Sequence, residues 1–446
     1  MISRSSVARL ALGPMRSARP FQARGFAAAA SGSSSFETYD AAGVKAASRD
    51  AHGQLAKLAV VVKAGTRYQP LPGLTVGLEE FAFKNTTKRS ALRITRESEL
   101  LGGQLNAYHT REALVLETAF LREDLPYFAE LLAEVLTQTR YTTHEFHEEV
   151  ERAIHLKQEK LSSNPAAISL DAAHAVAFHN GLGAPMYPSA LAPTKRYLDE
   201  YSVAAFAEQV YSKPNIALVA DGASQSALTQ WASKFFNEVP SSSQGIKTTA
   251  TTYYGGEQRI ESKAGNAITI AFPASGPEAS VLAALLGGQS SIKWSPGFSL
   301  LSKIAASTGA TAASHSFSYS DAGLLTITLS GSAASVTQAA QEAVKALQSV
   351  ASGSVSKEEV TKAIASARFD ALDKTQSSKE SIISFGSALV HGTQPVQAAD
   401  LVKNYASVTS AKLQQVAKTL LEGKATVTTV GDLHALPYAQ DLGLKV

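Results

Sequence analysis

The chain has 446 residues, of which 45% are hydrophobic, 18% are charged and none is cysteine. At roughly 100–200 residues per domain, this length predicts two or more domains. The absence of cysteine excludes disulfides, thiolate zinc sites, cysteine-bound iron–sulfur clusters and a cysteine nucleophile, and the formal net charge of +3 is too small to indicate nucleic-acid binding.

Residues 1–26 have the composition of a mitochondrial transit peptide. They contain five arginines and no acidic residue, with serine, alanine and leucine between them, which is typical of a basic amphipathic helix. We expect cleavage after Phe26. Without these five arginines, the 41 basic residues fall to 36 against 38 acidic ones, so the shortened chain carries a net charge of −2. No later stretch approaches the roughly 18 apolar residues that span a bilayer.

Strand and helix patterns alternate in the residues that follow. Residues 56–63 and 113–120 are apolar and predict two strands. Asp124 is a candidate N-cap for a helix, and Thr142 with Glu145 predicts a capping box at the start of the next helix. The apolar residues that share one face of the helix after Asp124 are Leu125, Phe128, Leu132, Val135 and Leu136.

Several short motifs recur in the same order at offsets near 205–212 residues, which indicates a duplicated domain. In the second copy, Ser356 and Glu359 predict another capping box. Residues 240–256 are polar and small, as in a linker. We therefore expect two homologous α+β domains, residues 36–239 and 257–446, each with a mainly antiparallel sheet and helices packed on one face.

Two motifs carry a resemblance to a known family. Residues 73–86 read GLTVGLEEFAFKNT, and residues 99–108 read ELLGGQLNAY. The first resembles the zinc-binding region of the pitrilysin/mitochondrial processing peptidase family, and the second resembles that family's Glu-x-x-Gly-Gly-x-x-Asn-Ala segment. The resemblance extends over nearly the whole chain after residue 26 and implies the processing-peptidase-like fold.

The same resemblance implies a zinc site that has lost its ligands. In the family, two histidines and a distant glutamate bind zinc, and a further glutamate activates water. The histidine positions hold Val76 and Glu80, and only Glu79, at the position of the general base, is kept. The distant position holds Lys157, although a register shifted by two residues would place Glu159 there. We expect no metal, no cofactor and no catalysis, and we interpret Glu79 and Glu80 as surface carboxylates.

Two further sets of family positions bear on substrate binding. The positions of a substrate-binding arginine and tyrosine hold Ala305 and Ala312. The strand that holds substrate in active members needs only its backbone, so the resemblance leaves a candidate peptide-binding edge strand. Its residues are Leu105, Asn106, Ala107 and Tyr108.

One cluster could be read as a metal site independently of the resemblance. His144, His147 and Glu151 have helical spacing. Because acidic residues surround them, we interpret them as exposed side chains on a solvated helix.

Two non-catalytic branches of the family fit the chain. Residues 287–298 lack the glycine run of the α subunit of the matrix processing peptidase, whereas residues 319–324 and 430–438 are more similar to core subunits of respiratory complex III. The resemblance therefore implies a structural core subunit on the matrix side of the mitochondrial inner membrane. It would pair with core protein 1 and contact other subunits, including cytochrome b. The alternative is the non-catalytic α subunit of the peptidase, which binds presequence peptides.

The charged residues are unevenly distributed. Residues 265–302 contain only Glu278 and Lys293 as charged residues, and residues 304–320 contain none. Centres of protein interfaces are depleted in charge, so we expect subunit contacts in this part of the chain.

Overall fold

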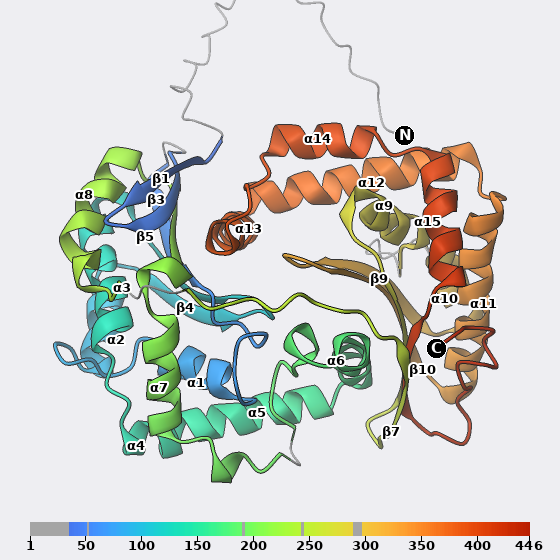
Figure 1. The fold of residues 1–446 in the computed structure, drawn as a ribbon, viewed down its shortest axis with the longest axis horizontal. Coiled ribbons are helices and arrows are strands. Elements are labelled where there is room, and N and C mark those ends of the chain that lie inside the picture. Colours follow the sequence, from blue (N-terminus) through green and yellow to red (C-terminus); the bar gives the residue numbers. More distant parts are fainter. Residues whose placement is uncertain (1–34, 51–52, 190–191, 242–244, 289–296) are drawn as a thin grey trace, which may run out of the picture.

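The computed structural model describes residues 35–50, 53–189, 192–241, 245–288 and 297–446 (Figure 1). The expected transit peptide, residues 1–26, lies outside the described residues. The chain has two sheets with helices packed around them, so the predicted α+β class is confirmed. We call residues 36–239 the first half and residues 257–446 the second half.

The first half contains a six-stranded sheet in its described residues, in the order β1-β2-β6-β3-β5-β4. Strands β2 and β6 are parallel, and the other neighbours are antiparallel. The strands are β1 (Glu37–Ala41), β2 (Val44–Arg49), β3 (Leu55–Val62), β4 (Gln104–His109), β5 (Leu114–Leu121) and β6 (Ile216–Asp221). The helices are α1 (Leu74–Phe81), α2 (Ala91–Leu100), α3 (Leu125–Gln138), α4 (Thr143–Glu145), α5 (Glu151–Ser162), α6 (Pro165–Phe178), α7 (Glu200–Val210) and α8 (Gln225–Phe235).

The described residues of the second half form a five-stranded sheet in the order β7-β11-β8-β10-β9. This order repeats β2-β6-β3-β5-β4, and its one parallel pair, β7 with β11, corresponds to β2 with β6. The strands are β7 (Gly256–Glu261), β8 (Asn266–Pro273), β9 (Thr311–Ser318), β10 (Gly323–Gly331) and β11 (Thr426–Gly431). The helices are α9 (Gly276–Leu286), α10 (Leu300–Thr308), α11 (Ala333–Ser352), α12 (Lys357–Gln376), α13 (Ser378–His391), α14 (Ala398–Ala406) and α15 (Ser410–Glu422).

The local signals in the sequence mostly agree with these elements. The two predicted strands are β3 and β5, and the five apolar residues predicted on one face of α3 are all buried. The capping box of Ser356 and Glu359 is complete. Only half of the other box forms: the Thr142 hydroxyl accepts a hydrogen bond from Glu145 N, but the Glu145 carboxylate binds the backbone N–H of Asn85.

Each half contributes one helix that packs on the sheet of the other half, an arrangement that the sequence did not predict. Leu58, Val60 and Val62 of β3 point into the main core of the first half, whereas Ala59 and Val61 point to the opposite face of the sheet. That opposite face is covered by α13, which belongs to the second half. Helix α6, from the first half, covers the second sheet in the same way. Figure 1 shows both helices between the two sheets.

Small residues allow these helices to lie close to the sheets. Gly386 of α13 faces Val61, and a Cβ atom at this glycine would lie 2.3 Å from Val61 Cγ2. Ser169 of α6 is fully buried, and its hydroxyl donates to Thr269 Oγ1 at 2.8 Å. The two halves therefore share cores instead of meeting at a solvated boundary. None of the helices in the described part of the chain has the length and apolar character needed to cross a membrane.

Candidate functional site

Helix α1 carries Val76, Glu79 and Glu80, the residues that we expected at the positions of the metal motif. It begins after Gly73, which adopts a left-handed conformation with φ 103°. The Gln69 side chain accepts hydrogen bonds from the backbone N–H groups of Gly73 and Thr75, which satisfies donors that a helix start leaves unpaired. The apolar face of the helix packs into the core of the first half. Glu79 and Glu80 therefore point away from that core.

Lys157 of α5 reaches both of these glutamates. Its Nζ lies 2.7 Å from Glu79 Oε1 and also forms an ion pair with Glu80. The side chains of Glu79 and Glu80 are only 11% and 23% exposed. Our interpretation of the two as surface carboxylates was therefore wrong, because one long lysine side chain bridges adjacent helix positions that cannot face each other. Glu159, the alternative at this position, is exposed.

His109 also belongs to this cluster, and the sequence analysis missed it. It is the last residue of β4, its side chain is 1% exposed, and its Nδ1 contacts Glu79 Oε2. Its Nε2 lies 3.1 Å from the backbone oxygen of Met186. The only signal in the sequence was its place directly after Tyr108, the last of the four residues predicted to bind a peptide.

Opposite charges in this cluster shift the pKa values of Glu79 and Lys157. Burial raises the pKa of Glu79, but His109 and Lys157 outweigh this effect and hold the pKa below its usual value. Burial likewise lowers the pKa of Lys157, but the two glutamates outweigh it and hold the pKa above its usual value. Glu79 is thus an ionised carboxylate at neutral pH, and Lys157 is a charged ammonium.

This arrangement neutralises carboxylates with a cation. A protonated lysine has three donors and no lone pair, so it cannot be a metal ligand. Val76 is fully buried in the core and has no donor atom. In the described residues, no group of three or more histidine, cysteine or acidic side chains is placed to hold a metal ion.

Ala305 and Ala312 lie on consecutive elements of the second half, α10 and β9. Ala312 is fully buried, and Ala305 packs against the same core. Both side chains are methyl groups, so neither can hydrogen-bond a substrate backbone.

The candidate peptide-binding strand is β4, the end strand of the first sheet. A groove of about 460 Å³ lies beside it, lined by Leu105, Asn106 and Ala107 together with Glu79 and Glu80. Tyr108 points to the other face of the sheet, where Lys379 Nζ lies 4.4 Å from the centre of its ring. Three of the four residues therefore border the groove.

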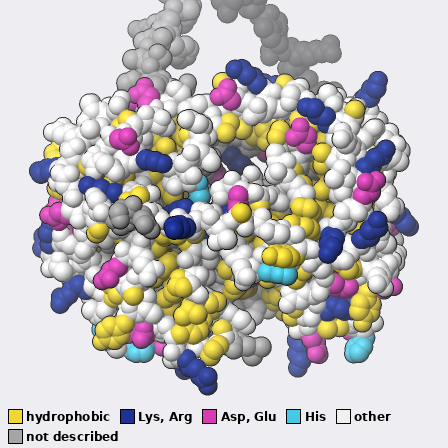
Figure 2. All heavy atoms as spheres, viewed as in Figure 1, with side chains coloured by type: hydrophobic (Ala, Val, Ile, Leu, Met, Phe, Trp, Pro, Cys, Tyr) yellow, Lys and Arg dark blue, Asp and Glu magenta, His cyan; other side chains and the backbone are white. Residues whose placement is uncertain are grey.

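His144 and His147 are 75% and 61% exposed. Each pairs with a glutamate four residues further along the chain, Glu148 or Glu151. They lie on a solvated helical surface, as we interpreted them. Figure 2 shows acidic and basic side chains interspersed on the face that it displays.

Comparison with known proteins gives the family. Residues 45–189 match insulinase (peptidase family M16), and residues 198–367 match the peptidase M16 inactive domain. The chain belongs to peptidase family M16, so the expected membership of this peptidase family is confirmed. It is a non-catalytic member of that family.

Individual proteins of known name resemble the chain along most of its length. The chain is 60% identical over 457 residues to cytochrome b-c1 complex subunit 2, mitochondrial, of Neurospora crassa, and the comparison covers 100% of both chains. It is 38% identical to the subunit 2 of Yarrowia lipolytica, over 91% of this chain and 96% of the relative. The mouse (Mus musculus) subunit 2 is 28% identical over 90% of each chain.

Proposed function

We propose that the chain is a non-catalytic structural subunit of mitochondrial respiratory complex III, ubiquinol–cytochrome c reductase. The observation that carries this proposal is the similarity to subunit 2 of the cytochrome b-c1 complex, which extends over the full length of the chain at 60% identity. It favours this role over that of a processing-peptidase subunit. The ion pair of Lys157 with Glu79 is consistent with it, since a scaffold needs the fold of the family but not its metal.

The finer placement is also a proposal. Residues 1–26 would act as a transit peptide, and the mature chain would be peripheral on the matrix side of the inner membrane. It would pair there with core protein 1 and contact cytochrome b. The composition of residues 1–26 and the scarcity of charge in residues 265–320 support this placement.

A depletion experiment tests the function. In mitochondria that lack the chain, native electrophoresis should show loss of assembled complex III, while presequence cleavage continues. Re-expression of the Glu79→Gln variant should restore assembly, because no catalysis is required. Normal complex III together with impaired presequence cleavage would instead support the peptidase subunit.

We also propose that β4 retains the capacity to bind an extended peptide. The observation that favours this is the groove of about 460 Å³ beside the backbone of this end strand, which could pair with an extended peptide. Crosslinking of a photoreactive presequence peptide to the full chain should label residues near Asn106. Absence of label there would contradict peptide binding without affecting the structural role.

A further inference from the structure

Two equivalent hairpin loops meet between the halves. Residues 110–113 connect β4 to β5, and residues 319–322 connect β9 to β10, which are the corresponding strands of the second sheet. Each loop is closed by one backbone hydrogen bond, Thr110 N to Ala113 O at 2.7 Å and Tyr319 N to Ala322 O at 2.8 Å. Each carries a carboxylate at its third residue. The duplication therefore brings two acidic side chains, Glu112 and Asp321, to the boundary of the halves.

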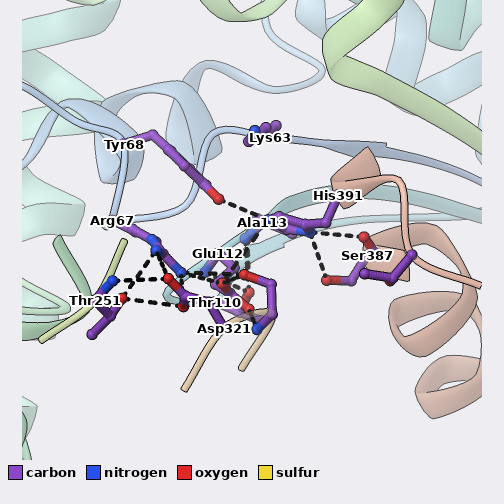
Figure 3. A network of polar contacts seen from close by, with 12 residues as sticks. Lys63, Arg67, Tyr68, Thr110, Glu112, Ala113, Thr251, Asp321, Ser387 and His391 are labelled. Carbon is purple, nitrogen blue, oxygen red and sulfur yellow. Dashed lines mark hydrogen bonds and ion pairs between the residues drawn. The ribbon is translucent and has the colours of Figure 1, made fainter. Parts of the chain in front are cut away.

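Arg67 lies between these two carboxylates (Figure 3). Its Nη1 lies 2.8 Å from Glu112 Oε1 and 2.7 Å from Asp321 Oδ1, and its Nη2 lies 2.6 Å from Asp321 Oδ2. The contact with Asp321 is bidentate, the strongest geometry for an arginine–carboxylate pair. The side chains of Arg67 and Glu112 are 3% and 9% exposed, so solvent screens their charges little.

The corresponding position of the second half, counted from the end of the strand, holds no cation. Arg67 lies five residues after the end of β3, and the residue five places after the end of β8 is Glu278. One guanidinium therefore serves both loops. The hydroxyl of Ser320 also donates to Glu112 Oε1 at 2.6 Å, which ties the second loop directly to the first.

The same guanidinium binds the segment that connects the halves. Its Nη2 donates to the backbone oxygen of Thr249 at 2.9 Å and to Thr251 Oγ1 at 3.0 Å. Thr251 N in turn donates to Asp321 Oδ2 at 3.0 Å. Burial raises the pKa of Asp321, but Arg67 and Thr251 outweigh this effect and hold the pKa below its usual value.

We propose that Arg67 is a latch that fixes the two halves and their connecting segment in a single arrangement. Without its charge, Glu112 and Asp321 would face each other as like charges in a poorly solvated site, and separation of the halves would be favoured. The latch adds to the packing of α6 and α13 between the halves and fixes the angle at which the two sheets meet.

Pulsed electron paramagnetic resonance on the full chain tests this proposal. Because the chain has no cysteine, spin labels can be attached selectively at Thr95→Cys on α2 and Gln348→Cys on α11, both exposed and at opposite ends of the molecule (Figure 1). The otherwise unchanged chain should give one narrow distance distribution. Arg67→Met should shift and broaden it. The matched control is Arg122→Met, which removes a bidentate pair with Asp50 inside the first half and should leave the distribution narrow.

Two results would overturn the latch: an unchanged distribution for Arg67→Met, or equal broadening for Arg122→Met. If Arg67→Met does not fold, Asp321→Ala takes its place. This variant removes the second-half partner of Arg67 at a side chain that is 29% exposed, and the same two criteria decide the outcome.

Discussion

Lys157 and Glu79 form an ion pair with 2.7 Å between Nζ and Oε1, although the two residues lie 78 positions apart on different helices. We propose that these two residues stand at the positions of a metal ligand and of the general base in active members of the family. The ammonium group of Lys157 neutralises the carboxylate of Glu79. The ion pair is a structural contact between α1 and α5.

Replacement of Lys157 by methionine should destabilise the chain. Glu79 and Glu80 would lose their shared cation while the methionine keeps most of the packing. Since the lysine side chain is 25% exposed, solvent screens part of the loss. We expect the free energy of unfolding to fall by about 1–3 kcal/mol, measured by urea denaturation. Lys160→Met, at an exposed position of the same helix, is the control, and an equal effect of both variants would contradict the structural role of Lys157.

His174 should make the fold sensitive to acid. Burial, with a smaller contribution from the charge of Arg111, lowers the pKa of His174 to about 3, and its Nε2 lies 2.8 Å from the hydroxyl of Tyr319. Above pH 6.5, the pKa of the ring in the unfolded chain, the ring is neutral in both the folded and the unfolded chain, so its contribution to folding stability is fully present. As the pH falls toward 3, only the unfolded chain takes up this proton, and stability falls by about 1.4 kcal/mol per pH unit.

The His174→Gln variant isolates this effect. It removes the proton uptake, so its free energy of unfolding should fall less steeply than that of the unchanged chain between about pH 6 and pH 4. Chemical denaturation at a series of pH values measures both slopes. Equal slopes would show that His174 is not held neutral in the folded chain.

Gly386→Ala should separate α13 from the first sheet. The new methyl group would overlap Val61 at a cost of about 1–3 kcal/mol, which offsets or outweighs the gain of about 1 kcal/mol in helix propensity. Combined with Val61→Ala, which removes the overlap, the same substitution should cost nothing. Thermal unfolding of the unchanged chain, the two single variants and the double variant completes this double-mutant cycle. Additive effects of the two substitutions would mean that α13 does not pack against Val61.

Phe298→Asp should weaken assembly without unfolding the chain. Phe298 is 79% exposed and lies in residues 265–302, which contain few charged residues. Burial of strand β8 explains the lack of charge in part of this stretch, but not at Phe298. A charge at the centre of a subunit contact costs binding energy. Native electrophoresis should show less assembled complex at unchanged thermal stability. Leu100→Asp, at an exposed leucine among charged neighbours on α2, should have the smaller effect.

Local patterns in the sequence predicted local structure well. Strand β3, the buried face of α3 and the capping box at Ser356 follow from hydrophobic patterns and capping chemistry, which act within a few residues. Such local patterns could not predict contacts between residues that lie far apart in the sequence. Arg67 and Asp321 lie 254 positions apart, and nothing near either residue indicates the other. Likewise, the apolar surfaces of α6 and α13 predict burial but not which of two similar sheets each helix covers.

The cluster around Glu79 shows the same limit. The resemblance located Glu79, Glu80 and Lys157, because these are positions in a known motif. It did not show that Lys157 contacts both glutamates, nor that His109 joins them, since these contacts depend on the lengths and directions of side chains from three separate elements.

The composition of the assembly that contains the chain tests its role most directly. The chain should be affinity-purified from mitochondrial membranes in mild detergent, and its molar ratio to cytochrome b should be determined by quantitative mass spectrometry, together with the zinc content. A structural subunit of complex III should be recovered in equal amount with cytochrome b and without zinc of its own. Recovery as a soluble pair that lacks cytochrome b, or with stoichiometric zinc and chelator-sensitive peptidase activity, would contradict the proposed role.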